Sequence, residues 1–307
     1  MTTTLRKSSP RTRDHTTRNK RWASPRSLFI VPALALTALF YFVPTVLNFG
    51  LAFTDWNSYR DEIRFIGFSN FQDLVAEGAL ANSLQVTITF ALAVVIIQNV
   101  LGLTLAVALE KTNGASSFFR VIFFLPVLIS PLAAGYIFTA ILSVKGPLNS
   151  ALGAVAGAPV PIEWLGSTTL TVFVLAAITA WKSFGLTMLI YIAGLNSIPE
   201  DVVESAQIDG ASPWRAFWSV RFPLLAPAVT FNVVFTLVGA MNTFDIVFAT
   251  TRGGPGTSTQ LFNIFVQQQY ATGFFGYAVS MTVVLLVCVV AGALPAIVLL
   301  RRREVTL

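Results

Sequence analysis

The sequence contains one cysteine and one histidine in 307 residues, and this scarcity excludes several kinds of chemistry. A disulfide needs two thiols, and a zinc site needs three or four Cys, His or carboxylate ligands. Cys288 lies in an apolar run and His15 in a charged segment, so we assign neither a functional role. The sequence also lacks a G-x-x-x-x-G-K-[ST] phosphate loop. It therefore predicts no disulfide, no metal site and no ATP hydrolysis by this chain.

Charged residues are scarce as well, at 11% of the chain, whereas 55% of the residues are hydrophobic. A soluble fold needs about twice this charged fraction to cover its surface. A disordered chain is poor in aromatic residues, whereas this one holds 26 Phe and 6 Trp. The composition therefore indicates an integral membrane protein.

Six stretches are apolar enough and long enough to cross a hydrocarbon core of about 30 Å, which takes about 20 helical residues. They are residues 28–53, 83–109, 121–143, 170–195, 224–250 and 274–300. The first run is too long for the apolar part of a signal peptide, so we expect it to remain in the chain. Pro126, Pro131 and Gly135 are expected to kink the third. The predicted fold class is all-α, a polytopic membrane protein with six transmembrane helices.

The basic residues are distributed unevenly between the two sides of these six spans. Fifteen of the 20 Lys and Arg residues fall on the side of the two tails, four fall on the other side, and Lys182 lies within a span. Cytoplasmic segments close to a membrane hold such an excess. We therefore expect both termini in the cytoplasm, with basic tails at 1–27 and 301–307, the first able to contact anionic lipid headgroups. Membrane topology therefore accounts for the net charge of +6, and no nucleic-acid partner is needed to explain it.

The largest predicted cytoplasmic loop, residues 196–223, is expected to fold as a helix, a turn and a second helix. Ser197 stands three residues before Glu200, which is the spacing of a capping box, and Gly210 is suited to end the first helix. Ser212 before a proline predicts the start of the second helix, and Pro223 is expected to close it. The first helix has one apolar patch and one acidic stripe. This pattern fits a helix that docks in a partner's groove, or equally a simple connector at the membrane surface.

The order Glu204-Ser205-Ala206, three residues, Gly210, nine residues, Val220, one residue, Phe222-Pro223 resembles the EAA loop of ABC importer permeases. The family pattern is Glu-Ala-Ala, three residues, Gly, nine residues, Ile, one residue, Leu-Pro. The spacing agrees throughout. Ser, Val and Phe replace Ala, Ile and Leu, and these changes weaken neither the helix nor the turn.

Other segments resemble the carbohydrate type of these permeases, the maltose and glycerol phosphate group. Together they cover about residues 28–300, and they are Phe65-Ile66-Gly67-Phe68-Ser69-Asn70-Phe71, Phe119-Arg120, Phe124-Leu125-Pro126, Ala193-Gly194-Leu195, Ile198-Pro199-Glu200, Asp209-Gly210-Ala211, Phe244-Asp245 and Thr251-Arg252-Gly253-Gly254-Pro255-Gly256. Arg252 interrupts the family's Thr-Gly-Gly-Pro, which leaves the geometry of that loop open.

This resemblance implies that residues 28–300 form a permease domain that provides half of a pathway for a sugar or a related solute. It implies three kinds of partner besides lipid: a second permease subunit, two cytoplasmic ATPase subunits that carry ATP and magnesium, and an extracytoplasmic solute-binding protein. The helix near Glu204 would be the coupling helix. The residues implied to act in this coupling are Glu200, Glu204, Ser205, Ala206, Asp209, Gly210, Ala211 and Pro223.

Lys182 lies about 12 residues from the outer end of its span, roughly 18 Å along a helix and close to the midplane. A lysine there costs about 2.5–3.5 kcal/mol, so it is expected to face a partner or a wet cavity. We therefore predict that Lys182 borders the translocation pathway, with Asn232 and Asn242 as further candidates; structural pairing or snorkelling of the lysine is the alternative. Asp245 is expected at the outer interface without a pathway role.

Two other functions compete with the importer permease. A self-sufficient secondary carrier or channel would explain the spans, but no internal repeat is evident and the acidic loop would have no role. An intramembrane enzyme would need catalytic groups, and the sequence has no H-E-x-x-H or G-x-S-x-G motif. The solute itself is not specified, although the resemblance favours a mono- or oligosaccharide over glycerol phosphate.

Overall fold

The computed structural model describes residues 30–76 and 78–302. The basic tail predicted at 1–27 and residues 303–307 of the C-terminal tail lie outside these ranges. Contacts divide the chain into two units, residues 1–48 and 49–307. Helices make up nearly all of the regular structure, and the described residues hold one isolated antiparallel bridge, between Thr54 and Phe65, and no named strand. The predicted all-α class is confirmed.

In the first unit the described residues are helical and apolar. Helix α2 (Ile30–Thr37), a π-helical turn η1 (Ala38–Phe42) and α3 (Val43–Leu51) follow one another without a break. Together they form one 22-residue candidate membrane span with no buried residue, which agrees with the first predicted run. The last residues of α3 belong to the second unit.

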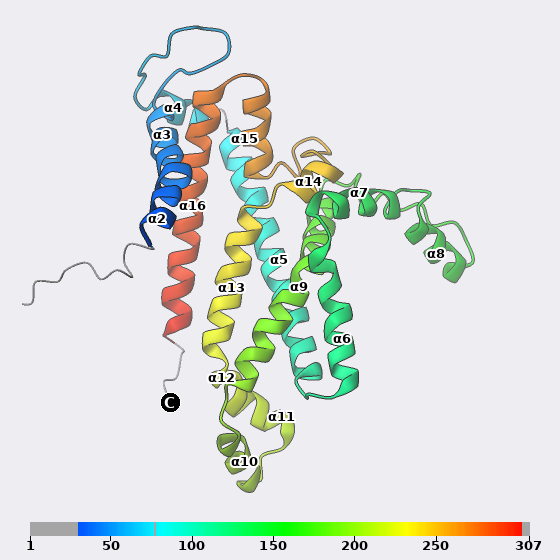
Figure 1. Ribbon diagram of the computed structural model, residues 1–307. Coiled ribbons are helices and arrows are strands. Elements are labelled where there is room, and N and C mark those ends of the chain that lie inside the picture. The colour runs from blue at the N-terminus through cyan, green and yellow to red at the C-terminus, as the bar shows by residue number, and fades with distance from the viewer. Residues whose placement is uncertain (1–29, 77, 303–307) are drawn as a thin grey trace, which may run out of the picture. The chain divides into compact units, whose positions relative to one another are not determined.

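The second unit contains three long, uninterrupted helices, and they lie close to three of the predicted spans. They are α5 (Ala79–Leu109), α9 (Leu170–Asn196) and α16 (Phe275–Arg301). The fifth predicted span is divided into α13 (Ala226–Met241) and α14 (Asp245–Thr250). Figure 1 shows α5, α9 and α13 running alongside one another in the bundle.

The third predicted span does not cross as one straight helix. Helix α6 (Gly114–Phe124) continues into the 3₁₀ turn η2 (Leu125–Leu128), and α7 (Pro131–Ile141) then leaves at an angle of 96°. The bend falls at Ile129 and Ser130, whose ψ angles of 133° and 135° lie outside the helical region. For Ser130 the cause is the following Pro131, because a residue before a proline is disfavoured in the helical region. Counted by length and composition, the described residues contain five candidate spans, or six if this bent pair is one.

Gly135 does not contribute to the bend, contrary to our expectation. It lies within α7, where a Cβ would come 2.5 Å from the Cβ of Ala249 in α14. Gly135 therefore allows two helices to approach closely, as small residues do between membrane helices.

The shorter helices lie at the two ends of the bundle. Helices α4 (Ser69–Ala76), α8 (Pro147–Ala156) and α15 (Phe262–Ala271) join α7 and α14 at one end. At the opposite end, which we call the loop end, lie α10 (Glu200–Ile208), α11 (Pro213–Ala216), the π-helical turn η3 (Phe217–Arg221) and α12 (Phe222–Leu224).

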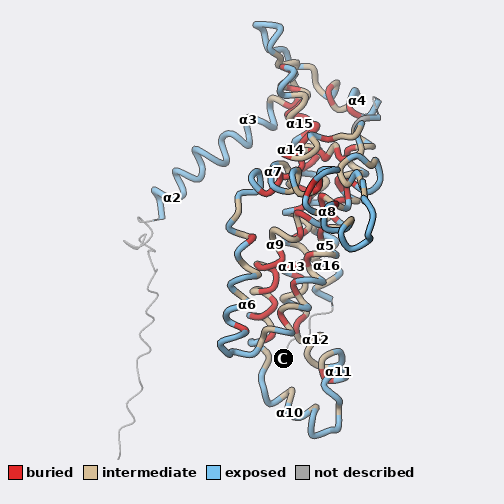
Figure 2. Tube along the Cα trace, turned by 90° about the vertical axis from the view of Figure 1, so that its right-hand side faces the viewer, coloured by how far each residue is buried: buried red, intermediate tan, exposed pale blue. Residues whose placement is uncertain are grey.

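The centre of the unit is the contact of α9 with α5 and α13, and α9 contains many of the buried residues (Figure 2). Gly102 of α5 makes this contact close, since a Cβ there would lie 2.6 Å from Cγ2 of Thr187 in α9. Polar pairs also cross it: Gln98 Nε2 donates to Thr187 Oγ1 at 2.8 Å, and the Tyr191 hydroxyl donates to Asn99 Oδ1 at 2.7 Å. Small residues and interhelical hydrogen bonds are the usual means of joining membrane helices, so α5 and α9 form the frame of the bundle.

Candidate functional site: a polar cavity and an exposed helical loop

A cavity of about 400 Å³ lies between α5, α9, α13 and α14, beside the bend that separates η2 from α7. Its walls mix apolar side chains with hydroxyl, amide and charged groups. The polar members are Gln98, Thr179, Lys182, Ser183, Thr236, Asn242, Thr243 and Asp245. Such a mixture allows the cavity to hold a hydrated or hydroxylated solute within an otherwise apolar bundle.

Lys182 lines this cavity from α9. Its Nζ donates to the carbonyl oxygen of Val127, at 3.4 Å, in the turn beside the bend. Among the described residues the ion pairs are Arg60–Asp55, Arg64–Glu62 and Arg221–Glu110, so no carboxylate neutralises this lysine within 4.0 Å. The structural pairing considered as the alternative is therefore limited to one carbonyl, and the ammonium keeps donors for a further group.

The two asparagines named with Lys182 lie in different surroundings. Asn242 ends α13, is exposed, and lines the cavity. Asn232 is completely buried, and its Nδ2 lies 3.5 Å from the carbonyl oxygen of Thr187 in α9. The structure thus brings Lys182 and Asn242 together at one cavity and places Asn232 at a helix contact outside its lining.

Sequence reasoning missed Asp245 as a cavity residue. A continuous helix over 224–250 would carry it about 32 Å along, to the outer interface. Instead the chain leaves the helical conformation at Asn242–Phe244, and Asp245 begins α14 at the edge of the cavity. Only the break in the helix, which composition does not reveal, brings this carboxylate to the cavity that contains Lys182.

The loop between α9 and α13 forms the predicted helix, turn and helix. Helix α10 carries Glu200 and Asp201 in its first turn, and Gly210 follows it with a φ of +82°. This left-handed conformation costs a glycine nothing, and it lets the Ala211 N–H reach the carbonyl oxygen of Ala206 at 3.0 Å. The second helix begins as expected, with the Ser212 Oγ accepting from the Arg215 N–H at 3.4 Å.

Two details of this loop differ from the prediction. Ser197 does not cap α10: it is the C-cap of α9, its Oγ donates to the Gly194 carbonyl oxygen at 2.7 Å, and Pro199 is the N-cap residue of α10. Pro223 does not end the second helix either. The helical path continues through it to Leu224, because the wide π-helical turn before Pro223 accommodates a residue without an N–H.

The face of this loop is open. Most of α10 is exposed (Figure 2). The exposed residues of α10 and the turn after it include Glu200, Glu204, Ser205, Asp209 and Gly210, and Ile208 is 86% exposed. Ala206 and Ala211 are half-buried, so they lie on the side that faces the rest of the loop. An acidic stripe with an exposed isoleucine is suited to a protein partner.

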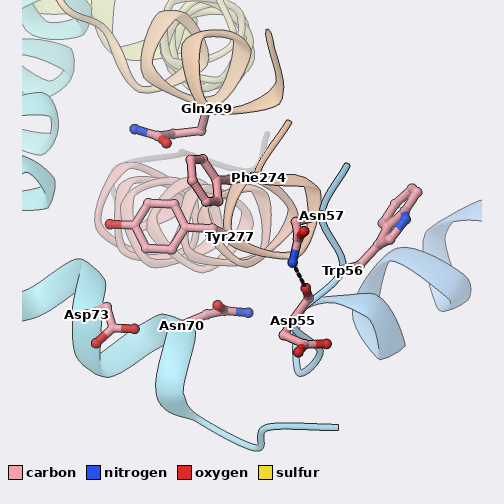
Figure 3. A pocket seen from close by; sticks show the side chains of 8 residues that line it. All are labelled: Asp55, Trp56, Asn57, Asn70, Asp73, Gln269, Phe274 and Tyr277. Carbon is pink, nitrogen blue, oxygen red and sulfur yellow. Dashed lines mark hydrogen bonds between the residues drawn. The ribbon is translucent and has the colours of Figure 1, made fainter. Parts of the chain in front are cut away.

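A second cavity, of about 330 Å³ (Figure 3), lies beside α4 and α15, at the end opposite the loop (Figure 1). It is lined by the segment after α3, by α4, by α15 and by the start of α16, through Asp55, Trp56, Asn57, Asn70, Asp73, Gln269, Phe274 and Tyr277. Backbone hydrogen bonds hold these segments together, from Ser58 N to Gly273 O at 2.9 Å and from Gly276 N to Trp56 O at 2.7 Å. This end of the protein therefore presents a fixed surface.

Comparison with known proteins gives the family. The family described as "Binding-protein-dependent transport system inner membrane component" matches residues 98–304. The chain is 36% identical to a probable starch degradation products transport system permease protein of Thermoanaerobacterium thermosulfurigenes, over 78% of this chain and 81% of that protein. It is 31% identical to an sn-glycerol-3-phosphate transport system permease protein of Agrobacterium fabrum, over 86% and 90% of the two chains.

A multiple sugar-binding transport system permease protein of Streptococcus mutans is 29% identical over 88% of this chain and 92% of its own length. Among solved structures, a chain of a bacterial ABC transporter involved in the import of the acidic polysaccharide alginate has a TM-score of 0.77 and 19% identity, over 90% of this chain and 95% of that chain. This last likeness shows the fold.

The chain belongs to the family of inner membrane components of binding-protein-dependent transport systems. It is a multi-pass membrane permease subunit of an ABC importer, and its relatives are transport components rather than enzymes. The resemblance found in the sequence is confirmed. Of the three functions considered from the sequence, the comparisons support the importer permease rather than the secondary carrier or the intramembrane enzyme.

Proposed function

We propose that this chain forms one half of the pathway by which an ABC importer moves a sugar or a related solute across the cytoplasmic membrane. The observation that carries the proposal is the polar cavity between α9, α13 and α14, with Lys182 and Asn242 on its wall. The starch-product and sugar permeases to which the chain is similar support the solute class. Hydroxyl, amide and ammonium groups on the wall match the hydroxyls of a saccharide, which the proposal favours over glycerol phosphate.

The proposed partners are a second permease subunit, two ATPase subunits and an extracytoplasmic solute-binding protein. ATP and magnesium bind to the ATPase subunits, and this chain binds no cofactor of its own. The binding protein delivers solute at the end that carries the cavity of Figure 3. In this arrangement the loop end and both termini face the cytoplasm, in agreement with the distribution of Lys and Arg.

Coupling to the ATPases is assigned to the loop 196–223, with α10 as the docking helix. The exposed residues Glu200, Glu204, Ser205, Asp209 and Gly210 meet the ATPase, while Ala206, Ala211 and Pro223 shape the loop behind them. Lys182 and Asn242 contact the solute. Asn232 supports α13 against α9 near the pathway.

The proposal is tested by purifying the tagged chain from its own cells in mild detergent and identifying what accompanies it. Wild type is expected to bring down an ATPase and a second permease. Glu204→Lys reverses a charge on the docking face, so it is expected to lose the ATPase while inserting normally. Glu62→Lys, which reverses an exposed charge at the opposite end, serves as the control and should keep the ATPase and the second permease. A wild-type chain that purifies alone would contradict the proposal.

A further inference from the structure

The loop end holds an ion pair that joins two distant parts of the chain. Arg221, in the π-helical turn η3, binds Glu110, which caps the C-terminus of α5. Arg221 Nη1 donates to Glu110 Oε1 at 3.1 Å, and Nη2 donates to Oε2. The side chains are only 20% and 21% exposed. This bidentate pair is therefore the strong kind of ion pair, with a fixed geometry and little competition from water.

The same end of α5 is also held by Arg120 of α6. Arg120 donates to the Leu109 carbonyl oxygen from Nε at 3.0 Å and from Nη2 at 2.5 Å, and to the Glu110 carbonyl oxygen at 2.9 Å. These are carbonyls that a helix leaves unpaired at its C-terminus, where a cation is favourable. Arg120 and Arg221 thus bind Leu109–Glu110 to both α6 and the segment after α10. We call these three side chains, Arg120, Glu110 and Arg221, the Glu110 clamp.

Helix α6 leads from the Glu110 clamp to the polar cavity. It runs beside α9 from the loop end toward α7 (Figure 1), and its continuation η2 contains Val127, whose carbonyl oxygen accepts from Lys182. Val127 and Pro131, on the two sides of the bend, both line the cavity. A displacement of α6 therefore changes a wall of the cavity.

The other two ion pairs of the described residues, Arg60–Asp55 and Arg64–Glu62, lie within one short segment at the opposite end. Only the pair of Arg221 with Glu110 joins two separate membrane-crossing parts of the described chain by charge. Arg221 also lies in a π-helical turn, a feature found frequently at functional sites. The position of the pair, directly between the loop and the frame of the bundle, is what a mechanical link requires.

We propose that the Glu110 clamp transmits movement of the coupling loop to the solute cavity, in addition to the direct connections of the loop to α9 and α13. When α10 moves, the ion pair with Arg221 displaces Glu110 and the end of α5. The hydrogen bonds of Arg120 to this end then displace α6. As a result, the cavity wall at Val127 and Pro131 moves relative to Lys182. Glu110, Arg120 and Arg221 are positioning residues, since none of them lines the cavity. This inference rests on the proposed function of the loop as the contact with the ATPases.

The test measures the movement of α6 in the whole complex, without knowledge of the solute. In a Cys288→Ser background, spin labels are placed at Leu128, at the end of η2, and at Val287 in α16, which are 70% and 60% exposed. Electron paramagnetic resonance then gives the distance distribution with and without Mg-ATP and vanadate. The parent complex is expected to change distance on adding nucleotide.

Three variants of the Glu110 clamp and one control variant distinguish a link from a merely structural contact. Arg221→Glu and the milder Glu110→Gln are each expected to lower the nucleotide-dependent change about tenfold, while the ATPases remain bound. The exchange Glu110→Arg with Arg221→Glu restores the pair in the opposite sense without altering the net charge, so it should restore the change. Arg64→Glu breaks an exposed pair at the opposite end and should have no effect.

The outcomes separate this inference from the proposed function. A parent complex that contains no ATPase overturns both. A complex with bound ATPases in which α6 stays still on adding nucleotide, or in which Arg221→Glu and Glu110→Gln move like the parent, overturns the Glu110 clamp alone. An assembled charge-exchange variant that stays uncoupled overturns it as well.

Discussion

Gly185 of α9 lies directly against Phe123 of α6, so closely that a Cβ on the glycine would come 2.3 Å from the phenylalanine's carbonyl oxygen. The obstruction is backbone, which cannot move aside as the end of a flexible side chain can. Gly185 is therefore the residue that lets α6 pack on α9 beside the cavity. This close approach of two helices depends on the absence of a side chain at position 185.

Replacing Gly185 by Ala is expected to destabilise the protein. Adding a methyl group to a packed contact costs about 1–3 kcal/mol through displacement of the neighbours. Thermal unfolding of the purified complex in detergent measures this, and the midpoint should fall. Gly239→Ala is the matched control, because nothing lies within 4 Å of the position its Cβ would take. Equal midpoints for the two variants would contradict the packing argument.

The spans that could be predicted well are those made of one uninterrupted apolar run. The run expected at 170–195 is α9 to within one residue, and that at 274–300 is α16 shifted by one residue. A single long apolar segment has only one way to satisfy its backbone in lipid, which is a helix. The helix, turn and helix of the loop at 196–223 could be predicted for another reason, because turn residues such as Gly210 act locally.

A kink in the third span was predicted correctly, but the size and exact position of the bends could not be, because tertiary contacts decide whether a membrane helix with a proline stays continuous. Pro126 and Pro131 favoured a kink, but the 96° turn at Ile129–Ser130 depends on what packs around it. The break at Asn242–Phe244 has no proline at all, and it carries Asp245 to the cavity. The ion pair between Glu110 and Arg221 spans 111 residues, and no local pattern reports such a pair.

Lys182→Met is expected to lower solute uptake by the assembled complex. If the ammonium donates a hydrogen bond to the solute, its loss costs about 1.5 kcal/mol or more, which is roughly tenfold in transport efficiency. The measurement is uptake of a panel of labelled saccharides into proteoliposomes that hold the complex and its binding protein. Lys145→Met, at an exposed position of the chain, is the control. Unchanged uptake and unchanged preference among the saccharides would show that Lys182 does not border the pathway.

Gly210 permits a direct comparison at one position of the loop. Its φ of +82° is unfavourable for a β-branched residue, whereas asparagine tolerates the left-handed region comparatively well. Gly210→Val is therefore expected to distort the turn and reduce ATP-driven uptake, and Gly210→Asn should retain most of it. Co-purification of the ATPase is measured in parallel. If valine and asparagine behave alike, the left-handed turn is not what the coupling loop requires.

Asn70 is expected to hold the outer segments in place. It is 7% exposed, and its Nδ2 donates at 2.9 Å both to the Ala52 carbonyl oxygen and to that of Thr54, just after α3. Asn70→Ala removes both bonds and leaves two carbonyls without this donor, at a cost of about 1–3 kcal/mol. Hydrogen exchange of residues 52–66 measures the effect, and it should become faster there while exchange in α9 is unchanged.

Asn82→Ala, which removes a 3.3 Å bond to the Thr257 carbonyl oxygen at an exposed site, is the control. Unaltered protection of residues 52–66 in Asn70→Ala would mean that the backbone bonds of Ser58 and Gly276 are sufficient to order this surface.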